Sequence, residues 1–169
     1  MVQNEASAST LENGLGMEVA FTRVFDAPRQ LVFKVWTDAK HLAQWWGPRG
    51  FTNPRCEWDV RPGGHIHIDM RGSDGRIYPM TGRFEEVIEL ERLVFINAAL
   101  DEWGKPMFEV RNTVTFSEKA GITTLTLTAR VITSTSNAPQ YLKGMEMGWT
   151  QSLERLAVQV ERALSTEPA

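Results

Sequence analysis

The sequence is poor in cysteine, in long apolar runs and in charge of one sign. Its 169 residues include a single cysteine, Cys56, which excludes an intrachain disulfide and is typical of a reducing compartment. No segment approaches the roughly 20 apolar residues that a membrane-spanning helix needs. The 18 basic and 21 acidic residues are mixed along the chain, and the net charge of -3 does not suit a nucleic-acid surface. We therefore expect a cytoplasmic protein that neither binds nucleic acid nor inserts into a membrane.

The motifs of the common catalytic classes are absent as well. The sequence contains no P-loop, no Gly-rich dinucleotide turn, no nucleophile elbow, no zinc-binding cysteine pair and no HExxH helix. Only 3 histidines are present as bases for a serine or cysteine nucleophile. We expect no cofactor and no metal, and nucleophilic catalysis is not predicted.

The two ends of the chain differ from its middle. Residues 1–15 have neither the basic stretch nor the apolar run of a signal peptide, and we expect them to form a disordered lead-in. Residues 166–169 are expected to form a polar tail. Residues 16–165 have the length of one domain and show no internal repeat.

A strand followed by two short helices is expected to open this domain. Residues 17–25 alternate between apolar and polar side chains, which predicts a strand. Asp26 and Pro28 then signal a helix with Pro28 in its first turn. Asp38 signals a second short helix, which ends at Gly47.

The residues after Phe51 predict about six strands at hairpin spacing. Turn signals separate them at residues 61–64, 72–75, 90–92, 101–106 and 117–121. Short connections make sequence neighbours antiparallel neighbours, so the first strand completes a curved antiparallel sheet of about seven strands. One long C-terminal helix remains to cover the concave side of this sheet. Since one helix cannot fill that space, a cavity is expected between them.

The C-terminal helix carries an apolar stripe whose character changes along its length. The stripe comprises Tyr141, Met145, Trp149, Leu153, Leu156, Val160 and Leu164. Its N-terminal half also holds Gly144 and Gly148, which cost about 1 kcal/mol each in helix propensity, so that close approach of backbone or ligand would explain them. Methionine fills irregular space. This half suits either a lid over a pocket or a core helix with irregular packing.

The strand HIHIDMR places two histidines and a carboxylate on one face. His65, His67 and Asp69 alternate with Ile66 and the other apolar residues. Such a row suits a metal or acid–base site, or a solvated outer face paired with neighbouring strands. The outer face is favoured, because the isoleucines and Met70 make the better core set.

Polar or aromatic residues stand out at two further places. Asn112 shares a strand face with Val110 and Val114, so it is either a polar anchor in the pocket or an amide satisfied by backbone. Trp45 and Trp46 are adjacent and are not expected to point inward to the same depth. One of them is a candidate for the mouth of the pocket, and the alternative is that both wedge the helices onto the sheet.

Several stretches resemble the domain family named for the activator of the heat-shock protein 90 ATPase. They are FDAPRQLVFKVWTD, WWGPRGF, DVRPGG, MRGSDG, GRFEEVIELERLVF and GWTQSLERLA, and they span residues 18–164. This family lies in the START-like, birch-pollen-allergen-like superfamily, which also holds aromatase/cyclase and lipid-transfer domains. The resemblance implies an α+β helix-grip domain over residues 16–165. It covers only the C-terminal domain of the eukaryotic co-chaperone, whose separate N-terminal domain engages the chaperone, so a chaperone partner is not expected.

We expect the cavity to bind a hydrophobic or aromatic small molecule. The candidate lining residues are Trp58, Ile66, Ile68, Met70, Met80, Phe84, Phe95, Val110, Asn112, Met145, Trp149 and Leu153. One alternative is a cyclase or hydrolase that orients an aromatic or polyketide-like substrate and transfers protons with a pocket side chain. Another is a co-chaperone-like interaction domain with an exposed apolar patch. The edges of the sheet also permit a weak homodimer.

Overall fold

The computed structural model describes residues 14–135 and 143–166, and this part of the chain forms an α+β fold. In chain order the elements are β1 (Glu18–Phe25), α2 (Arg29–Thr37), α3 (Ala39–Trp45), β2 (Thr52–Trp58), β3 (His65–Arg71), β4 (Ile77–Ile88), β5 (Arg92–Leu100), β6 (Pro106–Lys119), β7 (Ile122–Ser134) and α5 (Met145–Thr166). The expected lead-in and tail fall almost entirely outside the described residues, and so does Tyr141. No helix within the described ranges is long and apolar enough to cross a membrane.

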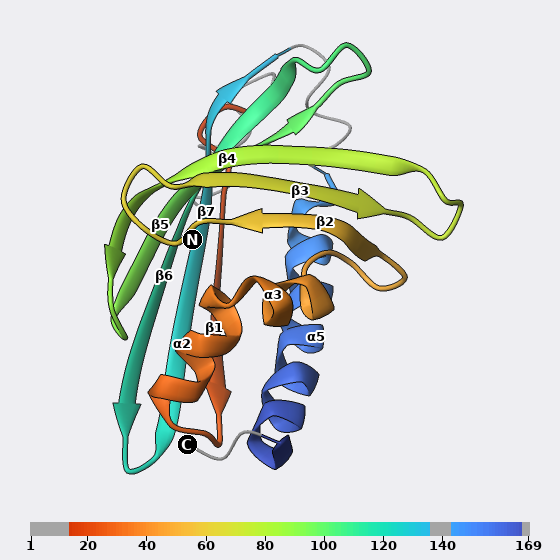
Figure 1. Cartoon of the computed structure of the whole chain (residues 1–169). Helices are drawn as coiled ribbons and strands as arrows, with labels where there is room; N and C mark the ends of the chain where they lie inside the picture. Colours follow the sequence, from red (N-terminus) through yellow and green to blue (C-terminus); the bar gives the residue numbers. More distant parts are fainter. Residues whose placement is uncertain (1–13, 136–142, 167–169) are drawn as a thin grey trace.

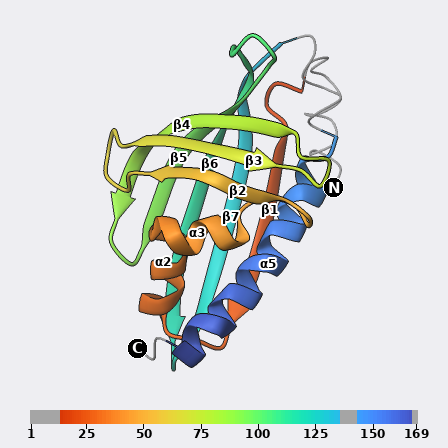
Figure 2. The same ribbon diagram turned by 45° about the vertical axis from the view of Figure 1, so that its right-hand side comes forward.

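The strands form one antiparallel, 7-stranded sheet in the order β1-β7-β6-β5-β4-β3-β2. Short connections join each strand from β2 onward to the next, as the hairpin spacing predicts. Figures 1 and 2 show that the sheet bends strongly and that α2, α3 and α5 all lie on its inner side. The predicted helix-grip arrangement, with two short helices after the first strand and a long C-terminal helix, is confirmed.

Short polar side chains fix the turns and the helix start. Asp74 Oδ1 accepts a hydrogen bond from the backbone N–H of Arg76 at 2.9 Å in the turn between β3 and β4. Asp38 caps α3, because its Oδ1 accepts from the N–H of Lys40 at 2.8 Å. Pro28 is the N-cap of α2, one position before the first helical turn in which it was expected.

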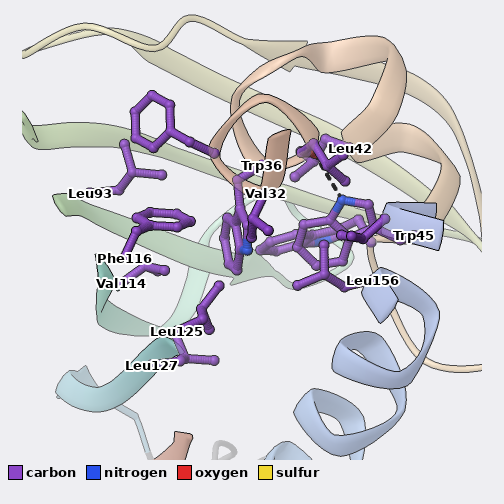
Figure 3. Close-up of a cluster of buried hydrophobic side chains, with 14 of the residues drawn as sticks. Val32, Trp36, Leu42, Trp45, Leu93, Val114, Phe116, Leu125, Leu127 and Leu156 are labelled. Atoms are coloured by element: carbon purple, nitrogen blue, oxygen red, sulfur yellow. Dashed lines mark hydrogen bonds between the residues drawn. The ribbon is translucent and has the colours of Figure 1, made fainter. Parts of the chain in front are cut away.

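The core is centred on Trp36 of α2, which is 0% exposed. Its ring centroid lies 4.7 Å from that of Trp45 on α3 and 6.4 Å from that of Phe116 on β6, both in edge-to-face geometry. Figure 3 shows Trp36 between these aromatic rings, with Leu127 of the sheet and Leu156 of α5 beside the same cluster. The two short helices are therefore packed against both the sheet and α5.

Helix α5 buries a stripe close to the predicted one. Leu153, Leu156 and Val160 are buried as expected. The stripe then ends on Ala163 instead of Leu164, whose side chain is exposed, because the inner face continues at a spacing of three residues after Val160. The C-terminal half of α5 is thus an ordinary core-packing helix.

The outer face of the sheet buries apolar residues of β5 beneath charged side chains. Ile96 is 1% exposed although it points away from the core, and Arg83 and Arg111 flank it on the two neighbouring strands. Arg111 donates to both carboxylate oxygens of Glu85, at 2.8 and 3.3 Å, which lowers the pKa of Glu85. The aliphatic stems of these arginines cover Ile96 while their charged groups stay in solvent.

Replacement of Trp36 is predicted to remove much of the stability of the fold. Trp36→Ala leaves a cavity at the centre of the aromatic cluster, and we expect the free energy of unfolding to fall by about 3–5 kcal/mol. The control is Trp103→Ala, at a side chain that is 76% exposed in the hairpin between β5 and β6, where a change within about 0.5 kcal/mol is expected. Urea denaturation followed by circular dichroism measures both. Equal losses in the two variants would contradict this assignment of the core.

Candidate ligand-binding cavity

A cavity of about 210 Å³ lies between the inner face of the sheet and the N-terminal half of α5. Its lining consists of Trp46, Gly47, Pro48, Met70, Tyr78, Pro79, Met80, Asn97, Ala99, Phe108, Met145, Gly148, Trp149 and Ser152. These residues come from α5, from β3 to β6 and from the loop after α3. The described lining is mostly apolar, and none of its side chains is an acid or a base that is charged at neutral pH.

One wall of the cavity is the first part of α5. Met145, Gly148, Trp149 and Ser152 recur at spacings of three or four residues, so they share one face of the helix. A Cβ atom built on Gly148 would have Pro48 Cγ, at 3.9 Å, as its nearest neighbour. Close approach of backbone therefore does not require a glycine there. The missing side chain instead leaves open space inside the cavity.

The opposite wall includes the loop after α3, which Arg155 of α5 fixes in place. Its Nη1 donates to the carbonyl oxygens of Trp46, Gly47 and Pro48 at 3.0, 2.9 and 3.0 Å. Its Nη2 donates to the carbonyl oxygen of Gln44 at 3.0 Å. Partial burial lowers the pKa of Arg155, but a guanidinium still stays charged near neutral pH. Trp46 O also accepts from Asn53 Nδ2 at 2.9 Å, and Pro48 O from the backbone N–H of Phe51 at 3.2 Å. Arg155 thus adds a charged donor to carbonyls at the end of α3 and ties this wall to the helix.

The expectation that Trp45 and Trp46 differ in depth is wrong, because they are 0% and 5% exposed. Helix α3 ends between them, since Trp46 has an extended backbone with φ −63° and ψ 134°. Trp45 points toward the helices, and its Nε1 donates to Val35 O at 3.1 Å. Trp46 points toward the cavity, with its ring centroid 5.4 Å from that of Trp149 and 5.7 Å from that of Trp58. The change of backbone direction lets two adjacent indoles be buried on different sides.

A pair of amides forms the polar part of the cavity and its floor. Asn112 is 0% exposed and lies behind Asn97, which lines the cavity. Asn112 Nδ2 donates to Asn97 Oδ1 at 2.6 Å and to the carbonyl oxygens of Phe95 and Val110 at 3.3 and 3.4 Å. Asn97 Nδ2 in turn donates to Met80 Sδ at 3.0 Å. Asn112 is therefore held by backbone and by a second amide, and it reaches the cavity only through Asn97.

Apart from Asn112, the residues predicted to line the pocket fall into two groups. Met70, Met80, Met145 and Trp149 lie at the cavity. The others face inward but pack within the hydrophobic clusters, and they are Trp58, Ile66, Ile68, Phe84, Phe95, Val110 and Leu153. The sequence therefore predicted correctly which strand residues face inward. It did not predict where along the strands the cavity lies.

Several lining residues were not anticipated from the sequence. Asn97 carries the same signal as Asn112, because it shares a strand face with the buried Leu93 and Phe95 and is an amide in an apolar alternation. Phe108 and Tyr78 have no such signal, since an aromatic residue near the end of a strand is common in many contexts. Their role at the cavity depends on where α5 crosses the sheet.

The polar row of β3 lies on the outer face of the sheet. His67 Nε2 is 3.0 Å from Asp69 Oδ1, and His65 Nε2 is 3.2 Å from Glu57 Oε1 on β2. The buried Ile66 lies on the opposite face of the strand. Among the described residues, no group of three or more histidine, cysteine or acidic side chains is arranged to hold a metal ion. The groups considered for proton transfer thus do not reach the cavity.

Comparison with known sequences identifies the family to which this fold belongs. Residues 26–161 match the family described as Activator of Hsp90 ATPase homolog 1-like protein. The match covers most of the chain, and the chain belongs to this family. No curated protein matches the sequence.

Solved structures with the same fold come from several bacteria. A protein from Chromobacterium violaceum has 27% sequence identity and a TM-score of 0.73, over 85% of this chain and 96% of that one. The AHSA1 protein of Silicibacter pomeroyi has 26% identity and a TM-score of 0.73, over 88% and 99% of the two chains. A protein from Arthrobacter aurescens has a TM-score of 0.76 over 87% of both chains, but with 23% identity it supports the fold alone.

Loss of the Arg155 guanidinium is predicted to loosen the cavity wall. Arg155→Met keeps the aliphatic length but removes the guanidinium from four carbonyls, of which Trp46 O and Pro48 O keep a second donor. We expect a loss of about 1–3 kcal/mol in the free energy of unfolding. The intrinsic tryptophan fluorescence of the protein should also change, because the loop that holds Trp46 is released. Arg162→Met, at an exposed arginine on the same helix, is the matched control and should leave both readouts unchanged. If Arg155→Met is as stable as the control, the hydrogen bonds from Arg155 to the loop after α3 do not stabilise the protein.

Proposed function

We propose that this protein binds a hydrophobic or aromatic small molecule in the cavity between the sheet and α5. The observation that carries the proposal is the composition of the lining, in which methionine and aromatic side chains surround about 210 Å³ of space. For comparison, an engineered apolar cavity of about 150 Å³ binds benzene. The cavity is therefore large enough for a substituted ring or a small fused-ring system. Ligand sites in proteins are commonly concave, largely apolar and provided with a few polar groups, as here.

Naphthalene is a suitable first ligand, because it tests the apolar cavity without any polar contact. We expect it to shift the 13C-methyl resonances of Met70, Met80 and Met145, which line the cavity. The methyl resonances of Met107 and Met147 should stay in place, since Met147 is 61% exposed and neither residue lines the cavity. Two-dimensional methyl NMR of the untagged protein makes this comparison within one sample. Shifts spread over all methionines, or no shift at saturating naphthalene, would contradict the proposal.

Filling the cavity from α5 should abolish binding without loss of stability. The space around Gly148 accepts a Cβ atom, so Gly148→Leu should place its side chain inside the cavity. Replacing a helical glycine raises helix propensity, and we expect the free energy of unfolding to stay equal or to rise by up to about 1 kcal/mol. Val158→Leu, at an exposed position on the same helix, is the control and should bind naphthalene as the unmodified protein does. Retained binding in a folded Gly148→Leu variant would place the ligand elsewhere.

The enzyme and co-chaperone alternatives gain less support from the described residues. A cyclase or hydrolase needs a proton-transfer group beside its substrate. The candidates for that role, His65, His67 and Asp69, lie on the outer face of β3. A co-chaperone role has the family description in its favour, but no surface among the described residues points to a chaperone. Native mass spectrometry of freshly purified, untagged protein distinguishes a retained small molecule from a bound protein.

A further inference from the structure

The orientation of the buried Asn112 amide is determined by its surroundings. Its Nδ2 faces three oxygen atoms, and two of them are the backbone carbonyls of Phe95 and Val110, which cannot be turned. Rotating the amide by half a turn would bring Oδ1 against these two carbonyls and lose both of their hydrogen bonds. The observed orientation leaves Oδ1 without a partner among the described residues, and this is the smaller cost.

This orientation fixes that of Asn97 in turn. The third oxygen that Asn112 faces is Asn97 Oδ1, at 2.6 Å, so the carbonyl side of Asn97 must point into the protein. Its Nδ2 then points to the cavity side, where Met80 Sδ is its acceptor at 3.0 Å. Thioether sulfur is a weak acceptor, and an amide NH2 group has two hydrogens to donate. The floor of the cavity therefore presents a hydrogen-bond donor that no oxygen atom satisfies.

A second polar group of the cavity lies on the opposite wall. Ser152 of α5 is 5% exposed and lines the cavity, so its hydroxyl is available to a molecule bound there. A serine hydroxyl can both donate and accept a hydrogen bond. The described lining offers no charged side chain to neutralise an ionised ligand, and an unpaired charge in such an apolar space is strongly disfavoured.

Building on the proposed function, we infer that the cavity selects a neutral aromatic molecule that carries a carbonyl-type acceptor oxygen. Asn97 Nδ2 donates to that oxygen, and Asn112 positions Asn97 for the task. Ser152 offers a hydrogen bond to a second polar group of the ligand. Asn97 is thus the residue that determines specificity, whereas the methionines and tryptophans supply apolar contact.

Three ligands of one shape test this inference. They are 2-acetylnaphthalene, which has the acceptor; 2-ethylnaphthalene, which lacks it; and 2-naphthoate, which is charged. Dissociation constants come from titrations of the Met80 methyl resonance. We expect the ketone to bind about tenfold more tightly than the hydrocarbon, and naphthoate to bind more weakly than either.

The variants Asn97→Leu and Asn97→Asp test whether the hydrogen bond that Asn97 donates, and not the shape of its side chain, determines the preference for the ketone. Asn97→Leu removes the donor while Asn112 keeps two backbone carbonyls as acceptors. Asn97→Asp keeps the acceptor for Asn112 but offers the ligand no N–H group. In each variant the preference for the ketone over the hydrocarbon should fall by about tenfold, while the affinity for 2-ethylnaphthalene is retained in Asn97→Leu. If one variant fails to fold, the other variant and the ligand preference of the unmodified protein still test the inference.

The outcomes distinguish this inference from the function on which it rests. A preference for the ketone that Asn97→Leu or Asn97→Asp abolishes supports it. Binding of the neutral ligands without preference, a preference that both variants retain, or naphthoate as the tightest ligand overturns it and leaves the apolar cavity as the binding site. Absence of binding by every ligand, naphthalene included, overturns the proposed function as well.

Discussion

The contact between Trp36 and Trp149 controls how α5 lies on the sheet. Their rings are stacked, with centroids 6.3 Å apart and an interplanar angle of 23°. Trp36 belongs to the fully buried core, and Trp149 also lines the cavity. The pair therefore marks the boundary at which close packing ends. Beyond it the cavity lies between the N-terminal half of α5 and the strands β3 to β6.

Two different interactions keep that space open. Arg155 holds the loop after α3 through its carbonyl oxygens, so the wall cannot move inward to fill the cavity. The other wall is sheet, whose strands are fixed by the backbone ladder; at Gly82 of β4 a Cβ atom would lie only 2.0 Å from Ile96 O. A hydrogen-bonded frame resists collapse better than apolar side chains alone, which rearrange to fill voids.

The sequence predicted the elements of this fold more reliably than the composition of its site. Turn residues such as Asp74 and the cap Asp38 act over a few residues, and alternation states which strand face is inner, so Ile66, Ile68 and Phe84 were placed on the correct face. Alternation does not state how far along a strand the covering helix reaches. Whether an inner residue meets core or cavity is decided by long-range packing, and for this reason Trp58 and Met70 have different surroundings. The end of α3 between Trp45 and Trp46 is a similar case, since one change of backbone direction decided which indole reached the cavity.

The glycine in the wall of the cavity is informative because it lowers the stability of α5 without a structural need. Gly148 lies in the first turn of α5 and donates its backbone N–H to Gly144 O at 2.8 Å, so alanine would be more favourable there by up to about 1 kcal/mol. It does not have a positive φ, and no backbone approaches it closely, so neither conformation nor packing demands it. What glycine does provide is space beside Trp149 and Ser152, next to an amide whose donor faces a sulfur atom. A glycine that lowers helix stability and an amide that donates only to sulfur lie at one cavity, and the proposed ligand would account for both.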